Sequence, residues 1–250
     1  MKFLILTLGL VLNFHNGMAK VMPDRLPKPC SKSVPDYNDC SLKFIKKFQV
    51  HMLNGIPELN IPSFNPFHLP AYVVNRTIND AVSISATIID AKIWGFDTME
   101  IKSFKFDHET QRGEAQAFFP NVRISFEYDA TGKLLSPTLL TDSGYCKADL
   151  IDLTVNGEFS YKTFEKLGVK YLSLDNAELS GDLGGANFKF ISKKAENQGA
   201  ADFITNFINE DPQRSINALF PVLKETGESV ARLILEQILS VIPADELIPE

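Results

Sequence analysis

The feature that most constrains the fold of this chain is a long central stretch of alternating apolar and polar residues. Between residues 76 and 191, apolar side chains occupy every second position in several segments, which include 82–88, 122–128 and 151–161. Successive side chains of a β-strand point to opposite faces, so this pattern predicts strands with one apolar and one polar face, as is usual in antiparallel sheets. Several of these strands are long, which favours one large curved sheet over a compact sandwich.

Helical patterns flank this stretch on both sides. A helix is expected to start at an N-cap on Asp39, to bury apolar residues at helical spacing up to Met52 and to end before Gly55. A second helix is expected from Pro212 to about residue 240, which gives a length of about 43 Å at 1.5 Å per residue. The predicted fold class is therefore α+β: a long C-terminal helix wrapped by a highly curved antiparallel sheet, with an N-terminal amphipathic helix.

The segment between the first helix and the strands, residues 56–70, holds four prolines and is called the strap below. Proline lacks a backbone N–H and fixes its φ angle, so the strap is predicted to form neither a helix nor a central strand. We expect it to lie extended and apolar over the rest of the molecule.

The first nineteen residues have the pattern of a secretory signal peptide. Lys2 is a short positive region, residues 3–12 are mainly apolar, and Gly17-Met18-Ala19 supplies small residues for cleavage after Ala19. The apolar run is about half the ~20 residues that a membrane-spanning helix needs. We therefore expect residues 20–250 to form a single secreted, extracellular domain with no stable membrane insertion.

Secretion would place the chain where cysteines can form disulfides and where asparagines can be glycosylated. Cys30 and Cys40 lie close together in the sequence and are expected to form a disulfide in an oxidising compartment. Cys146 is left over, either as a buried inert thiol, as part of a bridge between chains or as a reactive group. Asn75-Arg76-Thr77 is a glycosylation sequon, which makes Asn75 a candidate modification site.

Charge and missing motifs exclude several functions. The formal net charge is −6 and the isoelectric point is near 5.3, which disfavours nucleic acid as a partner. The chain has no Gly-x-Ser-x-Gly elbow, no phosphate-binding glycine loop and no His-Glu-x-x-His motif. His51, His68 and His108 are scattered. No catalytic residue, metal site or cofactor is predicted.

The apolar residues are dominated by phenylalanine, with 19 Phe against 6 Tyr and 1 Trp. Phenylalanine contributes apolar area without a polar group that must be satisfied. A cavity lined by such residues would accept a lipid-like molecule, although a Phe-rich solid core has the same composition. Tyr128 is in phase with Phe126, so its hydroxyl is expected to point inward, either to a ligand or to a backbone hydrogen-bond partner.

The order of several motifs resembles a known family. Cys30 and Cys40-Ser41-Leu42 precede the first helix, Gly55-Ile56-Pro57-Glu58-Leu59 follows it, and the end of the chain carries Phe207-Ile208-Asn209-Glu210 and Ile242-Pro243-Ala244-Asp245-Glu246-Leu247. This order is similar to that of the insect juvenile-hormone-binding and takeout family of secreted carriers. The resemblance implies a tubular lipid-binding fold with a hydrophobic tunnel. Hormone-binding members carry a second disulfide, for which this chain has no fourth cysteine, so the takeout-like branch is favoured.

The expected function is a secreted, non-enzymatic carrier of a small hydrophobic ligand such as a terpenoid, a juvenile-hormone-like molecule or a fatty acid derivative. The alternatives are a secreted interaction protein that acts through its surface, with an unknown protein receptor, and a lipid-cleaving hydrolase. The inward phase of the strands, the helix stripe and the first helix predict the residues that line the ligand site. They are Phe48, Met52, Ile84, Ile88, Phe126, Tyr128, Leu223, Gly227, Val230, Ile234 and Ile238.

Overall fold

The computed structural model describes residues 21–79, 82–134 and 140–250, so the predicted signal peptide lies outside the described residues. A six-stranded antiparallel sheet forms most of the molecule, in the order β1-β2-β4-β5-β6, and β3 pairs with the first part of β4. The strands are β1 (Phe67–Asn79), β2 (Val82–Trp94), β3 (Glu100–Asp107), β4 (Arg112–Leu134), β5 (Leu140–Lys166) and β6 (Val169–Ser192). The predicted large antiparallel sheet is confirmed.

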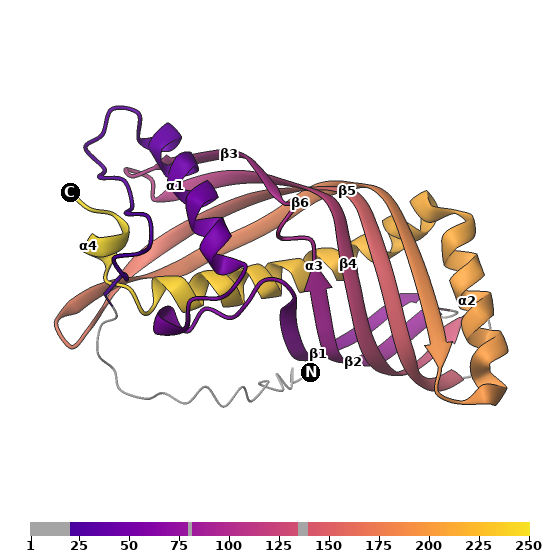
Figure 1. Ribbon diagram of the computed structural model, residues 1–250. Helices are drawn as coiled ribbons and strands as arrows, with labels where there is room; N and C mark the ends of the chain where they lie inside the picture. The colour runs from indigo at the N-terminus through magenta and orange to yellow at the C-terminus, as the bar shows by residue number, and fades with distance from the viewer. Residues whose placement is uncertain (1–20, 80–81, 135–139) are drawn as a thin grey trace.

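The sheet curls around one long helix, α3 (Pro212–Leu239), which runs lengthwise along its concave side (Figure 1). Helix α1 (Tyr37–Met52) packs against β3, and α2 (Gln198–Glu210) packs against β6. Shorter pieces are η1 (Pro57–Leu59), η2 (Ala195–Asn197) and α4 (Ala244–Leu247). The α+β class and the helix-wrapping sheet agree with the sequence prediction, and α3 begins at Pro212 as expected.

Two helix and strand boundaries differ from the prediction. Helix α1 begins at Tyr37, with Asp36 at the N-cap position, so Asp39 lies inside the first turn. Strand β1 begins at Phe67, inside the strap, and includes Pro70. Because β1 is an edge strand, the missing N–H of that proline removes no bond from the interior of the sheet.

The rest of the strap is apolar, as predicted, but it is not extended throughout, because Pro57–Leu59 form the 3-10 helix η1. Ile56, Leu59, Ile61 and Phe64 are all at most 4% exposed and belong to one buried cluster with Phe67. Gly55 has a φ of +78°, and a Cβ there would lie 2.9 Å from the Ser63 nitrogen, so the turn between α1 and the strap needs a residue without a side chain.

The strand pattern also contains one phase error. The alternation over 151–161 places Ile151 on the same face as Leu153, yet Ile151 is 43% exposed, whereas its neighbour Leu150 is 5% exposed. Asp152 has a φ of +52°, and the pairing between β5 and β6 skips this residue, so the alternation changes phase there. Leu153 consequently returns to the interior, against the cluster that contains Val122.

Side chains from the helices satisfy the open edge of β6. The Leu174 N–H donates to Glu236 at 2.7 Å and the Leu179 N–H to Glu228 at 2.9 Å, both on α3. Three further donors, from Phe188, Phe190 and Ser192, bond to side chains at 2.9–3.0 Å. The acceptors, all in α2, are Asn209, Thr205 and Gln198. An uncovered edge strand can pair with other chains, and these side chains prevent that here.

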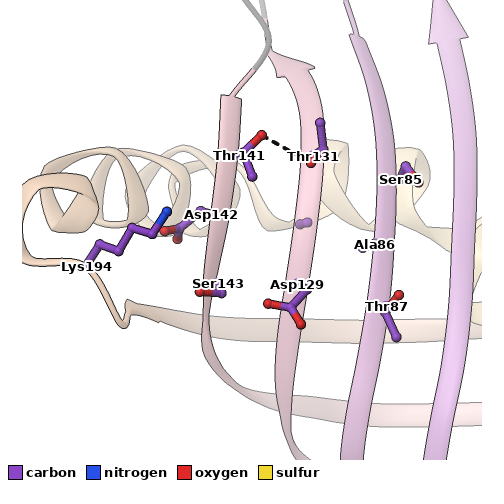
Figure 2. Close-up of a pocket in the computed structure, with 10 residues that line it drawn as sticks. Ser85, Ala86, Thr87, Asp129, Thr131, Thr141, Asp142, Ser143 and Lys194 are labelled. Carbon is purple, nitrogen blue, oxygen red and sulfur yellow. Dashed lines mark hydrogen bonds between the residues drawn. The ribbon is translucent and has the colours of Figure 1, made fainter.

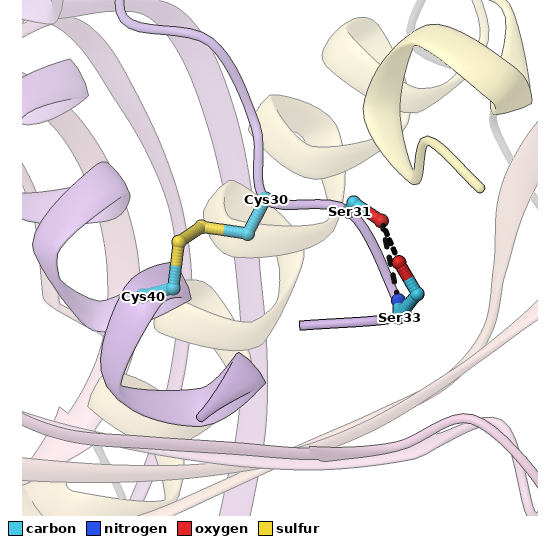
Figure 3. The surroundings of a disulfide bond; sticks show 4 residues. All are labelled: Cys30, Ser31, Ser33 and Cys40. Atoms are coloured by element: carbon cyan, nitrogen blue, oxygen red, sulfur yellow. Dashed lines mark hydrogen bonds between the residues drawn. A yellow bond between two sulfur atoms is a disulfide. The ribbon is translucent and has the colours of Figure 1, made fainter. Parts of the chain in front are cut away.

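The opposite end of the molecule is tied by a disulfide between Cys30 and Cys40 (Figure 3). It joins the N-terminal segment to the first turn of α1, which confirms the pairing expected from the sequence. Asn38, in the same turn, accepts the Phe106 N–H at 2.8 Å and so attaches α1 to β3.

Asn209 both accepts the Phe188 N–H and donates to the Phe188 carbonyl at 2.8 Å. Replacing it in Asn209→Ala should lower the free energy of unfolding by about 1–3 kcal/mol, because two partly buried backbone groups lose their partner. Asn206→Ala, at an exposed position one turn earlier in α2, should change it by less than about 0.5 kcal/mol. Urea unfolding measures both. Equal effects would mean that α2 does not hold the β6 edge.

The disulfide closes a loop with a sequence separation of 10. In the chain-entropy model a loop of this size stabilises the fold by roughly 2.5–3 kcal/mol. The double variant Cys30→Ser/Cys40→Ser should show this loss in urea unfolding. Intact mass of the wild type, alkylated in denaturant without reduction so that the buried Cys146 becomes accessible, should show a single modified thiol. More than one modified thiol would contradict the pairing in solution.

Candidate functional site

The inner face of the sheet carries rows of apolar side chains that cross several strands. Register pairs align Ile93, Ile124, Ala148 and Phe188 in one row over β2, β4, β5 and β6. The next row aligns Phe126, Cys146 and Phe190. These rows follow from the alternation of the strands, because paired residues on neighbouring antiparallel strands lie on the same face.

Most large side chains in these rows are only partly buried. Ile124, Phe126, Phe188 and Phe190 all retain accessible surface, although they lie on the face that curls around α3. The small and sulfur-containing members of the rows, Ala148 and Cys146, are 2% and 1% exposed. On the inner face the small side chains are therefore fully buried, whereas the large apolar side chains are only partly covered.

The structure brings seven of the eleven predicted ligand-site residues to one apolar cluster. Phe48 belongs to the buried part of the cluster, at 7% exposure. The other six residues are partly buried and pack against this cluster. They come from the end of α1, from β2 and β4, and from α3: Met52, Ile88, Phe126, Val230, Ile234 and Ile238. Because Phe48 is a core residue, its truncation would remove packing as well as any contact with a ligand.

Three of the other predicted residues lie apart from this cluster or are not described in full. Ile84 is on β2 in phase with Ile88 but is 44% exposed, near the start of the strand. Leu223 lies within α3, and its side chain is outside the described part of the structure. A Cβ added at Gly227 would lie 3.5 Å from Leu179 Cδ1, an ordinary contact distance.

The last predicted residue, Tyr128, belongs to a polar cluster beside the apolar rows. It is 8% exposed, and its hydroxyl donates to Asp142 Oδ2 at 2.9 Å instead of to the backbone. Ser192 and Asn197 donate to Asp142 Oδ1 at 2.7 and 2.9 Å. Burial alone would raise the pKa of Asp142, but these hydrogen bonds outweigh it and the pKa is lowered. Burial, followed by the hydrogen bond to Asp142, raises the pKa of Tyr128, whose hydroxyl stays neutral.

Sequence reasoning did not identify the partners of Tyr128. Asp142, Ser192 and Asn197 come from β5, β6 and η2, and no local spacing connects them to Tyr128. The apolar alternation at Phe188 and Phe190, in contrast, was visible in the sequence, and it could have added both residues to the predicted inner face.

Cys146 lies between Phe126 and Phe190 and is free. At 1% exposure it is out of reach of a second chain, and burial raises the pKa of its thiol to about 12. The protonated thiol is a poor nucleophile and behaves as a small apolar group. Of the three roles left open by the sequence, the structure favours the buried, inert thiol.

A pocket of about 390 Å³ lies at the other end of the sheet from α1 and has a different character (Figure 2). Hydroxyl and carboxylate side chains from β2, β4 and β5 line it, together with Lys194. They are Ser85, Thr87, Asp129, Thr131, Thr141, Asp142 and Ser143, and Ala86 and Ala130 complete the lining. This lining is polar, so the pocket is distinct from the apolar inner face.

Two further findings bear on the kind of site. Among the described residues, no helix is long and apolar enough to cross a membrane. Within the same residues, no group of three or more His, Cys, Asp or Glu side chains is arranged to hold a metal ion.

The structure is an antiparallel sheet curled around a long helix, with large apolar side chains on the inner face, as the resemblance in the sequence implies. The family model for haemolymph juvenile hormone binding protein matches residues 5–249, and the chain belongs to this family. No curated protein matches the chain significantly.

Among solved structures, Takeout 1 of Epiphyas postvittana matches with a TM-score of 0.68 and 16% identity, over 85% of this chain and 96% of that one. This likeness supports the fold. A lipopolysaccharide binding protein matches at a TM-score of 0.29 and 11% identity, over 67% of this chain and 35% of that one.

Tyr128→Phe tests the polar cluster. The variant removes one donor to Asp142, so it should lower the free energy of unfolding at pH 7 by about 1–3 kcal/mol. The pKa of Asp142 is lower in the folded state than its ordinary value of about 3.9. The charged carboxylate therefore stabilises the fold fully above about pH 3.9, and this stabilisation is lost as the pH falls through the folded-state pKa. The difference between variant and wild type should therefore shrink below about pH 4.

Urea unfolding at a series of pH values measures this difference. Tyr145→Phe is the matched control, because Tyr145 is 44% exposed on the neighbouring strand and the Lys193 ammonium lies over its ring, which the variant keeps. A pH-independent difference for Tyr128→Phe would show that its hydroxyl does not interact with the charged form of Asp142.

Proposed function

We propose that this chain is a secreted, non-enzymatic carrier that holds a small hydrophobic ligand between the inner face of the sheet and α3. A terpenoid, a juvenile-hormone-like molecule or a fatty acid derivative has the required chemistry. Membership of the haemolymph juvenile hormone binding protein family supports ligand binding and supports secretion of the chain.

The observation that carries the proposal is the incomplete burial of apolar side chains on the inner face. Large apolar side chains in a solid core are normally covered by their neighbours. Phe126 of the sheet and Ile234 and Ile238 of α3 pack against the same cluster, yet each keeps accessible surface. Accessible apolar surface in a concave setting is what an apolar ligand would cover.

The expected affinity follows from the area that such a ligand would bury. Removing about 300 Å² of apolar ligand surface from water contributes roughly 7–8 kcal/mol before association costs. Loss of translational and rotational freedom reduces this value. A Kd near the micromolar range or somewhat tighter is therefore expected.

The direct test is extraction of the purified protein with organic solvent and mass spectrometry of the extract. A lipid present at about one molecule per chain supports the carrier. A protein that is empty and that also fails to bind a panel of fatty acids and terpenoids would favour action through the protein surface instead. Turnover of ester substrates would indicate a hydrolase.

Phe126→Ala tests the inner face as the site. Phe126 is partly buried among residues from β2, β4 and α3, and its removal should weaken binding of a fluorescent fatty acid by about tenfold or more. The matched control is Phe203→Ala, because Phe203 is 58% exposed on the outer side of α2. Fluorescence titration below the thermal transition of each variant gives the two Kd values. Equal Kd values for both variants would exclude the inner face near Phe126.

A further inference from the structure

The polar pocket is built from two rows of side chains on the outer face of the sheet. Register pairs align Ser85, Thr131 and Thr141 in the first row. The second row consists of Thr87, Asp129 and Ser143. The Thr131 and Thr141 hydroxyls are hydrogen-bonded at 3.2 Å, as Figure 2 shows, and Lys194 approaches from the side of Asp142.

The glycosylation sequon extends the first of these rows. Asn75 on β1 is the register partner of Ser85, and the Ser85 hydroxyl donates to Asn75 Oδ1 at 2.6 Å. Asn75 and Thr77 are both exposed. The Ser85 bond uses the amide oxygen, so it does not engage Nδ2, the atom to which an N-linked sugar is attached. One residue, Ser85, therefore lines the pocket and touches the candidate modification site.

We infer that Asn75 carries an N-linked glycan and that the first sugars of this glycan lie in the polar pocket of the same chain. Neighbouring strands are about 4.8 Å apart, so Thr131 lies two strands, or about 10 Å, from Asn75 along the row. Sugar hydroxyls both donate and accept hydrogen bonds, and they match a lining of hydroxyls, the carboxylate of Asp129 and the ammonium of Lys194. The volume of about 390 Å³ falls within the range of about 300–1,000 Å³ typical of small-molecule sites.

Attachment to the chain explains how so polar a pocket could hold a sugar. A free sugar would exchange hydrogen bonds to water for similar bonds to the pocket and would gain little. A sugar linked to Asn75 is already held beside Ser85, so its association is intramolecular and the cost of bringing two molecules together is absent. The inference rests on secretion in the proposed function, because the sequon is used only in the secretory compartment.

The first experiment is expression in insect cells that secrete the chain, with intact mass before and after enzymatic removal of N-glycans. A glycan on the wild type that is absent from Thr77→Ala supports the modification. Secreted protein without a glycan overturns this inference and leaves the carrier proposal intact. Protein that stays in the cell and carries no glycan overturns both the inference and the proposed secretion.

The second experiment asks whether the glycan and the pocket act together. Thr131→Val/Thr141→Val removes two hydroxyls that bond to each other and puts methyl groups of similar shape in their place. No hydroxyl is therefore left without its partner. The glycan, compared with Thr77→Ala, should raise the melting temperature by about 2–4 °C with the native pocket, and by less than half of that with the Val pair. Thr163→Val, an exposed threonine on β5 outside the pocket, should leave the shift unchanged. An equal shift in all three backgrounds overturns docking of the glycan.

Hydrogen exchange on the unmodified pocket provides a readout that does not depend on folding of the Val pair. Peptides from residues 83–88 and 129–133 should exchange more slowly in the glycosylated protein than in Thr77→Ala. Peptides from residues 155–163, farther along β5, should exchange at the same rate in both. Identical exchange over 83–88 and 129–133 would place the glycan in solvent and overturn the inference.

Discussion

The open edge of β6 is the constraint on which the rest of the structure depends. Among the described residues no further strand pairs with the outer side of β6, so the outer N–H groups of this 24-residue strand need other partners. Glu228 and Glu236 of α3 and three side chains of α2 provide acceptors for five of these groups. The position of α3 is therefore fixed by polar contacts along one edge of the sheet as well as by apolar packing. A helix held in this way does not need to press into the whole concave face.

This arrangement accounts for the partly covered apolar interior. Val230, Ile234 and Ile238 pack against the cluster that includes Phe126, while the side chains near the strap and α1 are almost fully buried. The molecule thus has a solid end, built from the strap, Phe48 and Ile242, and a less densely packed middle. Stability and ligand binding can then depend on different residues, because the solid end stabilises the fold while the middle keeps apolar surface accessible.

The sequence predicted those parts of the fold that arise from local pattern. Alternation predicted the antiparallel sheet, Pro212 marked the start of α3, and the cysteine spacing predicted the disulfide. It failed where distant residues decide the outcome: the phase change at Asp152 needs a positive φ angle that no apolar pattern reveals, and β1 starts within a proline-rich segment only because it is an edge strand. The polar partners of Tyr128 were invisible for the same reason, since Asp142 and Asn197 meet it only after three strands and a helical turn have assembled.

The two faces of the sheet divide the chemistry of the chain because adjacent residues of a strand point in opposite directions. On β4, Phe126 and Tyr128 face the interior, while Asp129 and Thr131 line the outer pocket, so one strand contributes to both sites. The same holds on β5, where Cys146 is buried and Ser143 belongs to the pocket. A ligand against the inner face and a sugar on the outer face would therefore contact the same strands mainly through different side chains. Asp142 is shared, because it lines the pocket and bonds to the inward-facing Tyr128.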